Sequence, residues 1–315
     1  MRALILDGQL RVADDLSVPQ PQSDQALLKI YKAGICNTDL ELLAGYRGFS
    51  GILGHEFVAE VIKGPKDLIG HRVVGEINVV CGECEFCRLD IPSQCSNRKA
   101  IGISDHPGAF ADYLCLGSRN LHIVPEQVSD DAAVFVEPLA AALQVLEAVH
   151  ISPRDKVVVV GAGKLGLLVA QVLRLTGADV VVIVRHEKQA QLLSGWGITS
   201  LARADLPENS ANIVVDCTGT ADGFADCLDL VKSRGTLVLK STYAGLPNAD
   251  LTRVTVNEIR VVGSRCGPFE AALRILAGEM VDVESLIEAR YSLDQGVEAV
   301  NHAARKGVLK VLLDI

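Results

Sequence analysis

Residues 156–166 read KVVVVGAGKLG, a run of valines that leads into a turn containing Gly161, Gly163 and Gly166. Such a run is typical of a strand buried on both faces of a parallel sheet. Residues 164–178 then place apolar side chains every three or four positions, which predicts a helix. The glycines allow a tight turn and close approach of a pyrophosphate, and the helix start at Lys164 and Leu165 offers free N–H groups. In this context, the G-x-G-x-x-G pattern predicts a dinucleotide site.

The sequence on either side of this motif extends the same pattern. Further strands are predicted at residues 179–185, 212–219, 235–242 and 260–267, with helical stretches between several of them, and residues 137–151 are helical. Strands alternating with helices predict a doubly wound parallel sheet, and therefore an α/β fold.

The first 137 residues follow a different pattern. Short apolar stretches, such as residues 26–34, 57–65 and 72–80, are separated by Gly, Pro and Asp turns. This is typical of antiparallel or barrel-like β structure. The last part of the chain predicts a helix at residues 269–280 and a strand at residues 309–315.

Composition restricts the class of protein. The chain has 315 residues, too many for one ordinary core, so two domains are expected. Its formal net charge of -9 argues against a nucleic-acid partner, and no apolar run approaches the roughly 20 residues of a membrane span. The first residues resemble a strand rather than a signal peptide.

The free thiols indicate a reducing cytoplasm. Four cysteines are expected in or near the core: Cys115, Cys217, Cys227 and Cys266.

Four other cysteines lie close together, at Cys81, Cys84, Cys87 and Cys95. Gaps of two, two and seven residues separate them. This spacing fits one tetrahedral zinc ion held by four sulfurs, which leaves the metal no open position. We therefore expect a structural zinc in this lobe and chemistry elsewhere.

The predicted second strand of the parallel sheet bears on the choice of cofactor. An NAD site usually has Asp or Glu at its end, whereas this chain has Val184, followed by Arg185, His186 and Lys188. No carboxylate is placed to repel a 2′-phosphate, and a guanidinium is available to bind one. We therefore expect NADP(H) to be favoured over NAD. The alternative is that Arg185 is a solvated loop residue and either cofactor is used.

Several motifs occur in a fixed order along the chain: GICNTD around Cys36, GHEF around His55, the four-cysteine lobe, VEPLAAAL around Glu137, GAGKLG and the terminal LKVLLDI. Together they closely resemble the zinc-dependent medium-chain dehydrogenase/reductase family over nearly the whole chain. The resemblance implies a GroES-like catalytic domain at residues 1–137 and 268–315, with a structural zinc lobe at about 78–98. It also implies a Rossmann domain at residues 138–267.

The resemblance also implies a catalytic zinc, and thus two zinc ions per chain. Its ligands would be Cys36, His55 and Glu137, and the glutamate matches the polyol, threonine and sugar dehydrogenase branches. Glu56 would either approach the metal or orient a ligand as a neighbouring carboxylate. The alternative for Glu137 is an acidic residue that merely begins a helix.

Proton release is the point at which the chain departs from the family. Thr38 matches the hydroxyl that passes the proton, but Glu41 stands where many relatives have a histidine. Either Glu41 accepts the proton, or the proton leaves through water. Four further histidines are not expected to bind metal: His71, His106, His122 and His302.

The resemblance implies hydride transfer between NAD(P) and a small alcohol, polyol or sugar-type substrate. Alternatives are an NADPH-dependent carbonyl reductase, which would use the same site in reverse, and a non-catalytic nucleotide-binding or redox-sensing relative. The chain is shorter than most family members, and family substrate pockets are partly built from loops, so a relative's substrate is an unsafe guide to this one. By analogy, a homodimer or homotetramer is expected, with residues 260–267 as a pairing edge.

Overall fold

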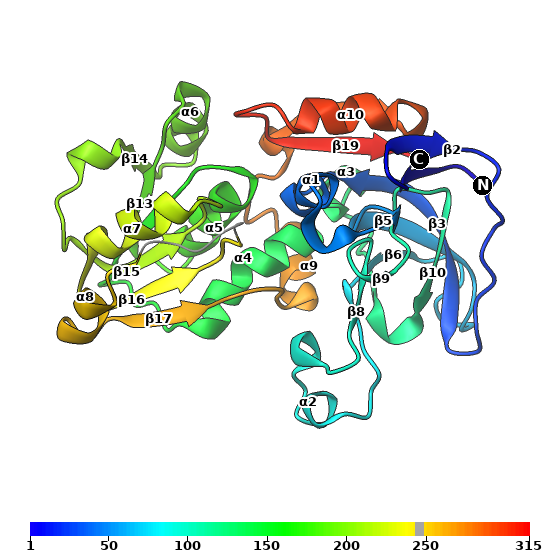
Figure 1. Ribbon diagram of the computed structural model, residues 1–315, viewed down its shortest axis with the longest axis horizontal. Coiled ribbons are helices and arrows are strands. Elements are labelled where there is room, and N and C mark those ends of the chain that lie inside the picture. Colours follow the sequence, from blue (N-terminus) through cyan, green and yellow to red (C-terminus); the bar gives the residue numbers. More distant parts are fainter. Residues whose placement is uncertain (243–248) are drawn as a thin grey trace. The chain divides into compact units, whose positions relative to one another are not determined.

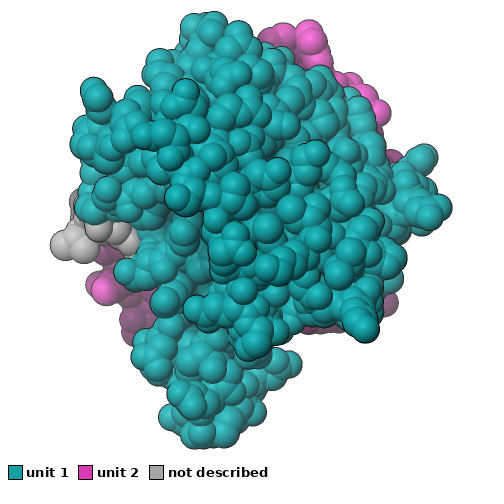
Figure 2. Space-filling model, turned by 90° about the vertical axis from the view of Figure 1, so that its right-hand side faces the viewer, with its two compact units in different colours: residues 1–137, 269–315 teal, residues 138–268 magenta. Residues whose placement is uncertain are grey.

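The computed structural model describes residues 1–242 and 249–315, which form two compact units (Figure 1). Residues 1–137 and 269–315 make up the first unit, so both ends of the chain contribute to it, and residues 138–268 make up the second (Figure 2). Within the described ranges, every helix is too short or too polar to cross a bilayer.

The second unit is built on a parallel sheet whose strand order is β14-β13-β12-β15-β16-β17. Numbered along the chain, this is the order 3-2-1-4-5-6 of dinucleotide-binding folds, which confirms the predicted doubly wound sheet. The strands are β12 (Lys156–Val160), β13 (Asp179–Ile183), β14 (Thr199–Leu201), β15 (Ala211–Asp216), β16 (Val231–Leu239) and β17 (Arg260–Gly263).

Helices of the second unit cross over between these strands. The valines of β12 are almost fully buried, as expected for a central strand with both faces covered. The helix α5 follows β12 directly and packs against it and β13. The crossover helices are α5 (Lys164–Arg174), α6 (Glu187–Gly195), α7 (Ala221–Leu230) and α8 (Leu251–Val256). Helix α4 (Val136–Ala148) precedes β12, and its first two residues belong to the first unit.

The first unit contains a larger, mostly antiparallel sheet in the order β11-β6-β5-β3-β19-β18, with β10 also paired to β3. Its strands are β3 (Gln25–Gly34), β5 (Glu56–Lys63), β6 (Arg72–Gly75), β10 (Tyr113–Gly117), β11 (Leu121–Ile123), β18 (Ile287–Ser292) and β19 (Lys310–Asp314). The terminal strand β19 pairs with β3, so the end of the chain completes the sheet that the N-terminal part begins.

The pairing of β3 with β5 positions the candidate site. Gly34, the last residue of β3, lies opposite Glu56, the first residue of β5. The chain leaving β3 and the chain entering β5 are therefore adjacent. This register brings Cys36 and His55 to the same edge of the sheet.

Smaller elements complete the first unit. The strands β1 (Ala3–Leu6), β2 (Leu10–Ala13) and β4 (Gly51–Ile52) form one small sheet, and β7 (Asn78–Val79), β8 (Lys99–Ile101) and β9 (Asp105–His106) form another. The helices are α1 (Asn37–Leu43), α2 (Glu85–Arg88), α3 (Asp130–Ala133), α9 (Phe269–Ala277) and α10 (Gly296–Ala303).

One predicted strand is divided in the structure. Residues 72–80 were expected to form a single strand, but they form β6 and β7, which belong to different sheets. A Cβ at Gly75 would lie 2.6 Å from a methyl carbon of Leu116. Between the two strands, the side-chain amide of Asn120 donates to the carbonyl oxygens of Glu76 and Asn78, at 3.0 and 2.8 Å, and so holds the segment that leads to the four-cysteine lobe.

Candidate functional site

Cys36, His55 and Glu56 converge where β3 ends and β5 begins. Cys36 precedes helix α1, and the other two residues lie at the entry to β5. The Cys36 sulfur, a His55 ring nitrogen and a Glu56 carboxylate oxygen all lie within 4.8 Å of one another. His55 and Glu56 are buried and Cys36 is half-buried. A thiolate, an imidazole and a carboxylate this close form a donor set suited to zinc.

Asp39 supports this group, and the sequence patterns did not single it out. Its side chain is fully buried, and one carboxylate oxygen accepts a hydrogen bond from the Cys36 backbone N–H at 2.8 Å. The other oxygen lies 3.4 Å from His55 Nδ1. One carboxylate thus fixes the backbone at Cys36 and stands beside the His55 ring, the usual partner of a metal-binding histidine.

The surroundings of His55 favour positive charge. Burial alone would lower the pKa of His55, but Asp39 and then Cys36 raise it well above its ordinary value. The same negative groups that raise this pKa would also attract a cation. The residues therefore fit a metal ion on electrostatic as well as geometric grounds.

Glu56 also belongs to a buried ion pair. Its Oε2 pairs with Lys310 Nζ, and both side chains are almost completely buried. Lys310 Nζ lies 3.5 Å from the carbonyl oxygen of Ile35 as well. Glu56 thus faces both the Cys36–His55 pair and a lysine from the terminal strand.

Glu137 stands in the first turn of α4 and is half-buried. Its carboxylate is not in the group of atoms that meet within 4.8 Å, where Glu56 stands instead. Burial would lower the pKa of Lys310, but Glu56, then Cys36, and Glu137 raise it. Glu137 therefore contributes negative charge to the same surroundings without joining the tightest cluster.

Thr38 and Glu41 lie three residues apart on α1, which places them on neighbouring turns of one helical face. Thr38 Oγ1 is 3.8 Å from the Cys36 sulfur. Glu41 is half-buried, and burial raises the pKa of its carboxyl above the ordinary value. The structure thus places a hydroxyl beside the candidate metal ligand and a carboxyl one turn further along.

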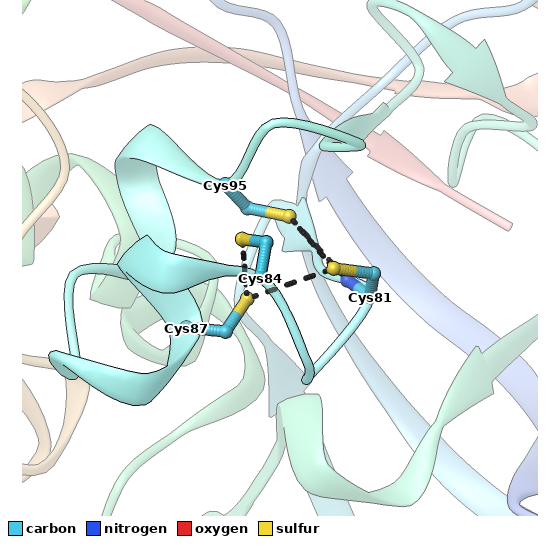
Figure 3. A group of neighbouring side chains, drawn as sticks. All are labelled: Cys81, Cys84, Cys87 and Cys95. Carbon is cyan, nitrogen blue, oxygen red and sulfur yellow. Dashed lines mark hydrogen bonds between the residues drawn. The ribbon is translucent and has the colours of Figure 1, made fainter.

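The four-cysteine lobe gathers its sulfurs around a common centre (Figure 3). The Cys84–Cys87, Cys81–Cys95 and Cys81–Cys87 sulfur pairs are 3.5, 3.6 and 4.0 Å apart. Zinc–sulfur bonds of about 2.3 Å in a tetrahedron require sulfurs about 3.8 Å apart. The arrangement therefore fits a zinc ion without rearrangement of the backbone.

Backbone N–H groups also point at these sulfurs. Hydrogen bonds from the backbone of Ser96 and then Cys87 lower the pKa of Cys84 to about 6, and the backbone of Glu83 helps to lower that of Cys81. By contrast, desolvation and the neighbouring thiols raise the pKa of Cys87 to about 11. Thiolates stabilised by N–H groups are the form that binds a metal.

The glycine turn in the second unit is closely packed at Gly161 and Gly166 and open at Gly163. Gly161 has a φ of +102°, and a Cβ there would lie 2.7 Å from the Cys217 carbonyl oxygen. A Cβ at Gly166 would lie 1.9 Å from the Gly161 carbonyl oxygen. A Cβ at Gly163, in contrast, would meet no atom within 4 Å. Gly163 precedes α5 and is exposed, so its surface is open to a ligand.

The residues that follow β13 are arranged for solvent contact. Arg185, His186 and Lys188 are exposed, whereas Val184 is half-buried and its N–H donates to the Leu201 carbonyl. His186 precedes α6. This edge of the sheet therefore presents basic side chains and no carboxylate at position 184.

Three of the other histidines have ordinary partners. His122 Nε2 lies 2.9 Å from Glu76, and His302 Nδ1 lies 2.9 Å from the Tyr291 hydroxyl. His106 Nδ1 lies 2.8 Å from the Pro107 carbonyl oxygen. In the part of the chain that the structure describes, groups of three or more possible metal ligands occur only around Cys36 and in the four-cysteine lobe.

Two family models match this chain. Residues 22–126 match the alcohol dehydrogenase GroES-like domain, and residues 165–278 match the zinc-binding dehydrogenase model. Among curated proteins, sorbitol dehydrogenase of Halalkalibacterium halodurans is 29% identical, with 94% of this chain and 93% of that protein aligned. L-threonine 3-dehydrogenase of Coxiella burnetii is 30% identical, with 73% and 72% aligned.

A solved structure agrees with these matches. A dehydrogenase structure from Sinorhizobium meliloti 1021, bound to NADP, superposes with a TM-score of 0.91 at 27% identity. The superposition covers 100% of this chain and 99% of that one. The comparisons confirm the resemblance inferred from the ordered motifs, including its GroES-like and Rossmann parts.

Proposed function

Because the chain belongs to the zinc-dependent medium-chain dehydrogenase/reductase family, we propose that it oxidises a polyol or sugar-type alcohol with NADP. The family establishes an alcohol dehydrogenase-like oxidoreductase that uses zinc and a nicotinamide cofactor. The choice of polyol is supported by the sorbitol dehydrogenase relative. The reaction removes a hydride from carbon and a proton from oxygen, and yields a carbonyl compound, reduced cofactor and a proton.

The convergence of Cys36 and His55 next to buried Asp39 carries the proposal. Cys36, His55 and Glu137 would hold a catalytic zinc, with Glu56 beside it, and the four-cysteine lobe would hold a second, structural zinc. When bound, the catalytic zinc supplies Lewis acidity to a substrate oxygen, and the nicotinamide accepts the hydride.

The protein's own residues would handle the proton. Thr38 would accept the proton of the substrate hydroxyl while it releases its own, because its Oγ1 lies 3.8 Å from the Cys36 sulfur at the candidate centre. Glu41 would accept the released proton and pass it toward solvent, since it is half-buried on the same face of α1. A carboxyl with a raised pKa is a better proton acceptor than an ordinary surface glutamate.

The preference for NADP is supported by the exposed side chains after β13. Arg185 offers a guanidinium for the 2′-phosphate, and Val184 contributes no competing carboxylate. Gly163 leaves the start of α5 open to the pyrophosphate. The S. meliloti relative was solved with NADP bound.

We further propose a homodimer formed through the edge strand β17. Val261 on β17 is 43% exposed, and Leu251 and Val256 on α8 are 67% and 74% exposed. Among the strands that the structure describes, β17 ends the sheet, and such an edge with nearby apolar side chains favours pairing with a second copy. Light scattering on the purified protein tests this proposal.

Nine free cysteines support a reducing compartment such as the cytoplasm.

The decisive experiment combines metal analysis with a substrate screen. We expect two zinc ions per chain, and turnover of at least one polyol or sugar that is faster with NADP than with NAD. Cys36→Ser should lose one zinc together with activity, whereas Cys87→Ser should lose the other. A single zinc per chain, retained in Cys36→Ser, would rule out the catalytic centre. Assays in both directions separate alcohol oxidation from carbonyl reduction.

A further inference from the structure

Asp216 is the last residue of β15 and is completely buried, at the carboxyl end of the parallel sheet. Its partner on the adjacent strand is Val160, the last residue of β12, so the chain leaving β15 runs beside the glycine turn that begins at Gly161. Ligands of such sheets bind outside the carboxyl ends of the strands. A buried carboxylate therefore stands at the edge of the sheet that carries the candidate dinucleotide site.

Three donors converge on one oxygen of this carboxylate. Asp216 Oδ1 accepts hydrogen bonds from the backbone N–H of Thr218 at 2.9 Å, from the Thr218 hydroxyl at 2.7 Å and from the Ser241 hydroxyl at 3.1 Å. Ser241 Oγ also accepts the N–H of Gly219 at 2.9 Å. The carboxylate thus closes a tight turn over residues 216–219, here called the β15 turn, and ties it to the chain just beyond the end of β16.

The glycine turn packs directly against the β15 turn. A Cβ at Gly161 would lie 2.7 Å from the Cys217 carbonyl oxygen and 3.1 Å from the Thr218 nitrogen. A Cβ at Gly166 would lie 3.3 Å from that of Cys217, and the Cys217 N–H donates to the Val160 carbonyl oxygen at 2.9 Å. The peptide between Cys217 and Thr218 therefore contacts the backbone that would receive the pyrophosphate, and a shift of this peptide would move the glycine turn.

The hydrogen bonds account for only one oxygen of the carboxylate. The other, Oδ2, is buried without a hydrogen-bond partner, and in the described part of the chain the donors to Asp216 are hydroxyl and N–H groups rather than basic side chains. Burying a carboxylate in this way is unfavourable for folding, but hydrogen bonds to an ionised oxygen are about twice as strong as those to a neutral one. The arrangement therefore favours a firmly held turn over a more stable sheet, which is typical of residues that support a binding site.

We propose that Asp216 is a positioning residue of the dinucleotide site, which fixes the β15 turn against Gly161 and so preorganises the glycine turn for the pyrophosphate. It would act without touching the cofactor, because its side chain is completely buried. The proposal deepens the function proposed above and rests on its nicotinamide cofactor. Loss of the carboxylate should weaken ligands that carry a pyrophosphate and spare ligands that lack one.

The test compares two ligands on the full chain. NADPH carries the pyrophosphate, whereas adenosine 2′-monophosphate (2′-AMP) offers only the adenosine and its 2′-phosphate. Asp216→Ala should raise the Kd for NADPH about ten-fold or more and leave that for 2′-AMP nearly unchanged. Asp216→Asn keeps an oxygen that can accept the same three hydrogen bonds, so it should recover most of the NADPH affinity. Fluorescence titration measures NADPH binding and ligand-observed NMR measures 2′-AMP binding, both below the melting temperature of each variant.

Two further variants support the comparison. Asp205→Ala is the matched control, since Asp205 is an exposed carboxylate of the same unit, and it should leave both affinities unchanged. Ser241→Ala keeps the Asp216 carboxylate but removes one donor to Oδ1 and the acceptor of the Gly219 N–H. It should weaken NADPH binding by a smaller factor than Asp216→Ala and spare 2′-AMP, which gives a test that does not depend on the folding of Asp216→Ala.

Several outcomes would overturn the proposal. Equal losses of NADPH and 2′-AMP affinity in Asp216→Ala would show that the carboxylate only supports the sheet, and full NADPH affinity in Asp216→Ala or Ser241→Ala would show that the β15 turn does not position the glycine turn. If Asp216→Asn binds NADPH as weakly as Asp216→Ala, the hydrogen bonds to Oδ1 are not the cause. The same comparison is made with NADH and AMP. A parent protein that binds only NADH refutes the preference for NADP, and the NADH comparison then decides the role of Asp216.

Discussion

The Asp39 carboxylate lies 3.4 Å from Nδ1 of His55, and both side chains are buried. Its second oxygen accepts the backbone N–H of Cys36 at 2.8 Å. The two candidate ligands are therefore linked through one carboxylate before any metal binds. Such a carboxylate selects the tautomer of the histidine and turns its other nitrogen toward the metal.

Replacing Asp39 by Asn should weaken metal binding at this centre by about 10- to 100-fold. The amide keeps the shape of the side chain but removes the negative charge that raises the pKa of His55. Competition with a chelator measures the affinity. Asp7→Asn, which alters an exposed ion pair with Arg11, provides the control and should leave zinc affinity unchanged. Equal affinities for Asp39→Asn and the parent protein would contradict the role of Asp39.

The glycine turn permits a matched pair of substitutions. Gly166→Ala would place a Cβ 1.9 Å from the Gly161 carbonyl oxygen, so the turn must shift and stability should fall by about 1–3 kcal/mol. Gly163→Ala would meet no protein atom within 4 Å and should leave stability nearly unchanged. It should nevertheless weaken cofactor binding, because its methyl group occupies the approach of the pyrophosphate.

Thermal unfolding and fluorescence titration with NADPH separate these two effects. We expect Gly166→Ala to unfold at a lower temperature. We expect Gly163→Ala to keep the stability of the parent protein but to bind NADPH more weakly. Full NADPH affinity in Gly163→Ala would show that the pyrophosphate does not approach this residue.

Cys87→Ser should remove the zinc of the four-cysteine lobe and lower the melting temperature. Its sulfur lies 3.5 and 4.0 Å from those of Cys84 and Cys81. Without it, the zinc ion would have three sulfur ligands instead of four. A closed site of this kind contributes to folding rather than to chemistry. The turnover number, calculated per enzyme molecule that still holds the catalytic metal, should therefore be unchanged. Cys115→Ser, outside both clusters, serves as the control. A lower turnover without a loss of stability would assign this lobe a role in the chemical step.

Much of the fold could be predicted from local patterns. The valine run of β12 and its glycine turn specify a buried strand that enters a helix, and the same alternation recurs along the second unit. The division of residues 72–80 between two sheets was not predictable, because this segment is held by hydrogen bonds from the Asn120 side chain to the carbonyl oxygens of Glu76 and Asn78. Those bonds join residues far apart in the sequence.

The site was less accessible to sequence reasoning. The ordered motifs identified Cys36 and His55 as candidate metal ligands. They did not point to Asp39 or to the pairing of Lys310 with Glu56. One signal was present in the terminal strand, since Lys310 interrupts an otherwise apolar stretch and a buried lysine requires a counter-charge. Its partner Glu56 is 254 residues away, and only the pairing of β19 and β5 with β3 brings the two together.

Arg185→Ala should raise the KM for NADP about ten- to a hundred-fold and leave that for NAD nearly unchanged. The estimate corresponds to the loss of one hydrogen-bonded charge contact to the 2′-phosphate. Steady-state kinetics with both cofactors measure the ratio. Arg234→Ala removes an arginine of the same unit that is 83% exposed and pairs with Glu258, and it should affect neither constant. Equal increases for NADP and NAD would reject the assignment of Arg185.

Glu41 should make stability depend on pH in a predictable direction. Burial raises its pKa, so the folded protein holds this proton more tightly than the unfolded chain does. The free energy of unfolding should therefore decrease as pH rises from the unfolded pKa, about 4.3, through the raised folded value. Glu41→Gln should lose this part of the dependence and be the more stable protein above that window. Urea unfolding at several pH values measures the difference, and parallel curves for the two proteins would contradict it.

The same carboxyl should shape the pH profile of alcohol oxidation. A protonated Glu41 cannot accept a proton from Thr38, so turnover should fall as pH drops through the raised pKa of Glu41. Glu41→Gln should remove this decline and lower the plateau at higher pH, because water must then carry the proton. Glu298→Gln, an exposed substitution on α10, should preserve the profile. If Glu41→Gln also preserves it, the proton leaves Thr38 through water, and Glu41 is only a half-buried residue of the helix.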